Sequence, residues 1–95
     1  MKLGGNIELE GFDNTEPAQL VVIKKIVGSS AKKISEEISA FDNLQVTLKE
    51  NEKDKITLSG KITIKGVDHE AEASDKNLFF ALNTLFNGLI AKIKG

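Results

Sequence analysis

The sequence contains no cysteine, which excludes disulfide bonds and thiolate metal sites. Its single histidine, His69, has no cysteine with which to build a metal site, and a structural role is expected for it. No apolar run approaches the roughly 20 residues that a helix needs to cross a bilayer. Residues 1–11 also lack the apolar segment of a signal peptide. These absences favour a soluble cytoplasmic protein that has no metal or other cofactor and no membrane partner.

Arginine is also absent: all 13 basic residues are lysines, and the formal net charge is −1. A charge near zero argues against general nucleic-acid binding, but the charges are unevenly distributed. Residues 76–95 contain three lysines and no acid, whereas residues 6–16 contain four acids and no lysine. Because lysine is a flexible point charge without the bidentate fork of arginine, a lysine surface would attract phosphates with little geometric selection.

Motifs of enzyme chemistry are lacking as well. There is no glycine-rich phosphate loop, no nucleophile elbow and no metal-binding motif. The acids at Asp68, Glu70 and Glu72 alternate along a predicted edge strand, where they would face outward and discourage pairing with other strands. Catalytic carboxylates have to converge in a pocket, so no enzymatic activity is expected.

The apolar pattern predicts one domain over residues 1–95. Alternating apolar and polar residues predict four strands, over residues 6–12, 44–48, 55–65 and 67–73. Apolar residues spaced by three and four predict two helices, over residues 16–39 and 76–92. The strands are apolar on one face only, so the expected fold class is α+β: a βαβββα two-layer sandwich, with two helices on one face of a four-stranded sheet, similar to a double-stranded-RNA-binding domain.

Capping residues, a proline and two glycines refine the predicted helices and strands. Thr15 is the expected N-cap of the first helix, with Pro17 in its first turn. Ser74 or Asp75 is expected to cap the last helix. Gly28 could allow a kink or a break in the first helix, and Gly60 a bend or bulge in the third strand.

The last strand–helix junction, AEASDKNLFFALN (residues 71–83), resembles the hibernation-promoting factor / ribosome-associated inhibitor A family. The resemblance rests on a pair of alanines, an acidic cap and the start of the last helix: Ala71, Ala73, Asp75, Leu78, Phe79, Ala81 and Leu82. The sequence departs from the family where Phe79 replaces a tyrosine, where Phe80 replaces a small residue, and in lacking a long C-terminal extension. The resemblance implies a short form that binds the small ribosomal subunit through rRNA, occludes its mRNA and tRNA sites and inhibits translation.

Lysines on the two predicted helices are the candidate rRNA-binding residues. They could form one basic track if the helices lie side by side: Lys24, Lys25, Lys32, Lys33, Lys76, Lys92 and Lys94. The alternative is that these helix faces are simply solvated. The open face of the sheet is a weaker candidate, because it lacks the aromatic residues on which an RNA-recognition sheet stacks bases.

Apolar residues outside the main helical stripes leave two further alternatives open. Phe80, with Asn83 and Asn87, could contact a base or a protein, or Phe80 could be an ordinary residue at the rim of the core. Val21, Val22 and Ile26 suggest a covered surface, and so a protein-interaction or oligomerisation module, including a homodimer, on the same fold.

Overall fold

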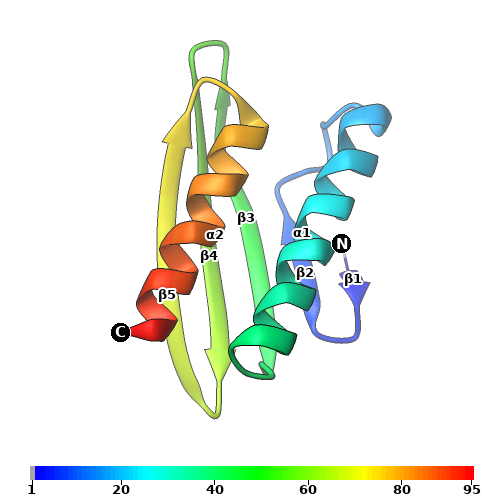
Figure 1. Cartoon of the computed structure of the whole chain (residues 1–95). Coiled ribbons are helices and arrows are strands. Elements are labelled where there is room, and N and C mark those ends of the chain that lie inside the picture. Colours follow the sequence, from blue (N-terminus) through cyan, green and yellow to red (C-terminus); the bar gives the residue numbers. More distant parts are fainter. Residues whose placement is uncertain (1) are drawn as a thin grey trace.

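The computed structural model describes residues 2–95 and contains a five-stranded sheet in the order β1-β2-β3-β4-β5. The elements follow one another as β1 Lys2–Gly4, β2 Ile7–Glu10, α1 Pro17–Glu37, β3 Asn43–Glu52, β4 Lys55–Ile64, β5 Val67–Asp75 and α2 Leu78–Lys94. β2 and β3 are parallel, and the other neighbouring strands are antiparallel. Both helices lie on the same face of the sheet (Figure 1).

The expected α+β class with two helices on one face is confirmed, but the expectation of four strands is wrong. β1 is an additional edge strand that pairs with β2, and Lys2 lies opposite Glu8. Three residues are too few to show a period of two. The turn residues Gly5 and Asn6 between Leu3 and Ile7 were the available signal for a hairpin. The expected likeness to a double-stranded-RNA-binding domain is not confirmed.

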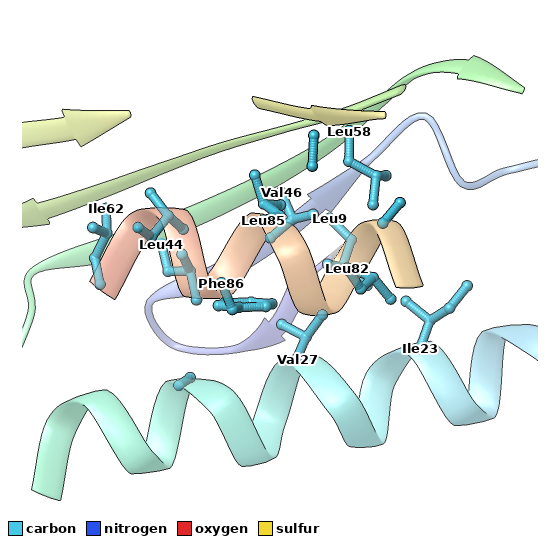
Figure 2. Packing of buried hydrophobic residues seen from close by; sticks show 14 of the residues in the cluster. Leu9, Ile23, Val27, Leu44, Val46, Leu58, Ile62, Leu82, Leu85 and Phe86 are labelled. Carbon is cyan, nitrogen blue, oxygen red and sulfur yellow. The ribbon is translucent and has the colours of Figure 1, made fainter. Parts of the chain in front are cut away.

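The core lies between the sheet and the two helices (Figure 2). α1 contributes its predicted stripe, in which Ile23, Val27 and Ile34 are completely buried. These side chains meet α2 and the covered face of the sheet, as expected for an amphipathic helix. α1 continues through Gly28 as one helix, so the glycine does not break it.

Gly60 has a different role from the one predicted. The register between β3 and β4 is regular around it, so there is no bulge at this position. A Cβ at Gly60 would lie 3.1 Å from a terminal carbon of Leu89 and 3.2 Å from one of Leu85. The glycine therefore lets α2 pack closely on the centre of the sheet. The bulge lies instead between Leu48 and Glu50.

Both predicted helix caps are wrong. The N-cap position of α1 is Glu16, without a side-chain hydrogen bond, and Thr15 instead donates its backbone N–H to Phe12 at 3.1 Å. The cap of α2 is Asn77, whose side chain accepts from the backbone N–H groups of Phe79 and Phe80. Pro17 does occupy the first turn of α1, where its missing N–H has no cost.

The residues predicted to cap α2 serve the connection into it. Asp75 accepts a hydrogen bond from the backbone N–H of Asn77 at 3.0 Å, which closes a turn just before the helix. Ser74 remains in β5 and its hydroxyl lies 2.9 Å from that of Thr57. The helix therefore begins two residues later than predicted, at Leu78, and ends at Lys94.

Candidate nucleic-acid interface

Charge is divided between the helix layer and the rest of the chain. The helix segments, residues 16–37 and 76–95, contain seven lysines and three glutamates, a formal charge of +4. The remaining residues contain six lysines and eleven acids, a formal charge of −5. The net charge of −1 therefore conceals a strongly polarised molecule. A polyanion would be attracted to the helix segments and repelled by the strands and loops, which carry the excess of acids.

The lining residues of two surface hollows show how α1 is rotated about its own axis relative to its neighbours. Lys32 lines a shallow hollow of about 360 Å³ together with Asn6 and Ile7, so this side of α1 faces the end of the sheet formed by β1 and β2. Gln19 lines another hollow together with Lys76 and Asn77, so its side faces the start of α2. Residues seven apart on a helix lie nearly on one line. The opposite sides of α1 thus face different parts of the molecule.

The four α1 lysines are distributed over these sides. Lys33 is fourteen residues after Gln19 and lies on the side toward α2. Lys25 and Lys32 are seven residues apart and share an exposed side, away from the buried stripe. Lys24 is half-buried and lies between that exposed side and the core. Lys25, Lys32 and Lys33 are therefore exposed on two different sides of α1, whereas Lys24 is half-buried.

The three lysines of the α2 region are also spread out. Lys76 immediately precedes the cap residue Asn77, at the end of the groove that Gln19 lines. Lys94 falls on the exposed side of the helix that carries Phe80, fourteen residues earlier. Lys92 is four residues after Gly88, which faces Ala71 of β5, and so lies toward the β5 edge. The predicted lysines therefore surround the helix layer and do not form a single row.

The helix lysines have no carboxylate partner among residues 2–95. The two ion pairs of this range join Lys49 to Glu72 at 3.4 Å and Lys55 to Glu50 at 3.8 Å, both within the sheet. Exposed pairs of this kind contribute little to stability, but they do neutralise the lysines involved. Of the eleven lysines outside these two pairs, seven belong to the helix segments, and the other four are Lys2, Lys53, Lys61 and Lys65.

The exposed face of α2 carries an uncharged stripe around Phe80. The side chain of Phe80 is 64% exposed, so the alternative of a rim contact to the core is wrong. Asn83 and Asn87 are exposed on the same side, three and seven residues further along. Phe79, by contrast, is half-buried against the core. Val21 and Val22 are also exposed, at 56% and 42%, near the start of α1.

The residue types that bind metal ions are not gathered at one place within residues 2–95. In the range 2–95, no group of three or more histidine, cysteine, aspartate or glutamate residues is arranged to hold a metal ion. His69 is half-buried in β5 opposite Ile62, and its structural role stays a prediction. Neither helix is long and apolar enough to cross a membrane.

Comparison with known proteins supplies a fold relationship. No protein-family model and no curated protein sequence matches the chain. Among solved structures, a ribosomal subunit interface protein from Coxiella burnetii is 14% identical with a TM-score of 0.74, over 94% of this chain and 93% of that chain. The N-terminal domain of Protein Y from Thermus thermophilus is 16% identical with a TM-score of 0.71, over 93% and 92%.

The resemblance inferred from the sequence is confirmed at the level of the fold. The similarity extends over nearly the whole chain, whereas the sequence motif covers only residues 71–83. Asn77, inside that motif, is the functional cap that the sequence reasoning missed. Its signal was available, since asparagine is among the best N-cap residues.

Proposed function

We propose that this chain, as a single domain over residues 1–95, is a ribosome-associated factor of the hibernation-promoting factor / ribosome-associated inhibitor A type. In this proposal it binds the small ribosomal subunit in the cytoplasm through rRNA, occludes the mRNA and tRNA sites and inhibits translation. The observation that carries the proposal is the polarised charge: a helix layer of +4 on a fold shared with a ribosomal subunit interface protein.

Phosphate contacts would supply the affinity. Each lysine that neutralises a phosphate releases condensed counterions, so binding weakens as salt is added. In this proposal, one extended ligand contacts about four of the exposed lysines through its phosphates. These lysines are Lys25, Lys32 and Lys33 of α1 and Lys76 and Lys94 of the α2 region. With about four such contacts, affinity is expected to fall on the order of 100-fold between about 50 and about 200 mM salt.

The proposed mechanism is occupancy and requires no chemistry. The helices are fixed to the sheet by a shared core, so the backbone that carries the lysines does not have to be ordered when it binds. A preorganised surface loses less conformational freedom on association than a flexible segment does. Inhibition would then follow from the volume that the domain fills on the subunit.

A protein-interaction or homodimerisation module is the second candidate, because Val21 and Val22 are exposed. Two copies that met through their helix layers would bring a formal +4 against +4. Like charges oppose such a contact at low salt. Light scattering tests this candidate: a stable dimer with no affinity for ribosomal subunits would favour it over the first.

Co-sedimentation with purified small subunits tests the main proposal. The double variant Lys25→Glu/Lys32→Glu should weaken binding by about tenfold or more and leave the thermal midpoint unchanged, because both side chains are exposed. The matched control is Lys53→Glu/Lys65→Glu, which makes the same charge change in two hairpin turns. The control should bind nearly as the wild type does. Equal losses in both variants, or no association of the wild type at low salt, would refute the proposal.

A further inference from the structure

The stripe of Phe80, Asn83 and Asn87 on α2 is not accounted for by phosphate binding. Its side chains carry no charge, and all three residues are exposed. The backbone N–H of Phe80 donates to the side chain of Asn77 at 3.2 Å, so the phenyl group projects from a capped and fixed first turn. A large aromatic group held in water in this way has no role in the core.

The surroundings of the stripe are cationic. No acid occurs in the first turn of α2 or after Asp75. Lys94 lies on the same side of the helix as Phe80, and Lys76 directly precedes the cap residue Asn77. A ligand here should therefore be anionic and also offer apolar faces to Phe80 and hydrogen-bonding edges to the asparagines. Nucleotides have this combination of groups.

We propose that the exposed stripe of α2 binds unpaired bases of RNA, with Phe80 stacking on a base and Asn83 and Asn87 contacting base edges. The inference rests on the proposed function, because it specifies which part of an RNA that same surface takes. In a duplex the base faces are covered by stacking, whereas unpaired bases stack readily on aromatic side chains. From Phe80 to Asn87 the helix rises by about 10 Å, roughly the length of three stacked nucleotides.

Charge decides between RNA and a second copy of the chain as the occupant. A copy that placed its own helix layer against Phe80 would add +4 to +4, whereas RNA brings phosphates to the flanking lysines. The exposed valines of α1 do not change this balance, because they are also uncharged. The surface is therefore complementary to a polyanion with accessible bases.

The test uses a feature of the composition: the chain has no tryptophan and no tyrosine. Phe80→Trp introduces a single fluorophore at the proposed stacking position. Binding of a single-stranded RNA of about 12 nucleotides, within the range of known site sizes, should quench its emission. The same RNA annealed to its complement should not. Phe80→Leu keeps an apolar side chain but removes the ring, and it should weaken single-strand binding by about 5- to 150-fold.

A matched control and a second ligand make the outcomes distinct. Val21→Leu changes another exposed apolar residue and should leave RNA affinity unchanged. If Phe80→Leu binds both single-stranded RNA and small subunits as tightly as the wild type while Lys25→Glu/Lys32→Glu binds subunits weakly, the stacking inference fails and the proposed function stands. If the wild type binds neither ligand, both fail. A wild-type dimer that Phe80→Leu dissociates would overturn the inference in favour of a second copy.

Discussion

The two helices pack on the same face of one sheet but approach it differently. α2 comes closer to β4 and β5 than α1 comes to any strand. Small residues explain this difference, because Gly60 lies under Leu85 and Leu89, and Gly88 lies over Ala71. α1 instead carries larger side chains, such as Ile23 and Val27, on its covered side, where they point toward α2 (Figure 2).

The ends of α2 are also better stabilised than the ends of α1. α2 begins with a side-chain cap and ends with Lys92 and Lys94 in its last turn, where cations interact favourably with the helix dipole. α1 has neither a side-chain cap nor a base in its last turn. α2 is thus the better-anchored helix, and α1 depends more on the core for its stability. α1 also presents Lys25 and Lys32, which are both exposed and do not belong to the core.

This comparison indicates how the chain combines stability with a charged surface. Close packing needs small or apolar residues, and phosphate binding needs exposed cations that carboxylates do not neutralise. α2 has small or apolar residues for close packing along most of its length. Only one of its sides is left for Phe80 and the asparagines. α1, held further from the sheet, has room for lysines on several sides.

The largest effect is expected from truncating a completely buried leucine of α2, compared with a half-buried leucine of α1. Leu82 of α2 is completely buried, so Leu82→Ala should lower the free energy of unfolding by about 2–5 kcal/mol. Leu20 of α1 is only half-buried, and Leu20→Ala should cost less than half as much, since part of its surface is already in water. Thermal denaturation of both variants measures the difference. Equal losses would contradict the greater anchoring of α2.

A smaller effect is expected from the caps. Asn77→Ala removes the acceptor for two backbone N–H groups of α2 and should destabilise the protein by about 1 kcal/mol. Thr15 makes no cap bond, and its buried hydroxyl has no hydrogen-bond partner among the described residues. Thr15→Ala should therefore be close to neutral. Urea denaturation can resolve the two variants, and a comparable loss from Thr15→Ala would show that α1 is capped through this residue after all.

The caps also indicate where prediction from the sequence ends. Thr15, Ser74 and Asp75 are all good cap residues by type, as is Asn77, and a propensity cannot choose between neighbours. The choice is made by tertiary structure: Ser74 is retained in β5 by its contact with Thr57. The periods of the long strands and helices were predicted correctly, because each is repeated over many residues. β1 was missed because it has only three.

The candidate site was predictable in its residue types more than in its geometry. The excess of lysine in residues 76–95 was evident from the sequence, but the separation of +4 from −5 emerges only when the helices are known to share one face (Figure 1). The scatter of Lys24 and Lys92 away from the common surface depends on how each helix is rotated. That rotation is fixed by packing partners such as Ala71, which are distant in sequence.

The smallest expected effect concerns the single glycine inside each helix. A Cβ at Gly28 of α1 would have no atom within 4 Å, so Gly28→Ala should stabilise the protein by up to about 1 kcal/mol through helix propensity alone. At Gly88 of α2 the added Cβ would lie 3.4 Å from that of Ala71, at the near limit of ordinary van der Waals contact. This is slightly closer than the optimum for two carbon atoms, so a small part of the same gain should be lost. The thermal midpoint should rise by about 4–8 °C for each kcal/mol, and so rise more in Gly28→Ala. If Gly88→Ala were stabilised equally, the close approach of α2 to β5 would not restrict the helix, and the contrast between the two helices would lose its physical basis.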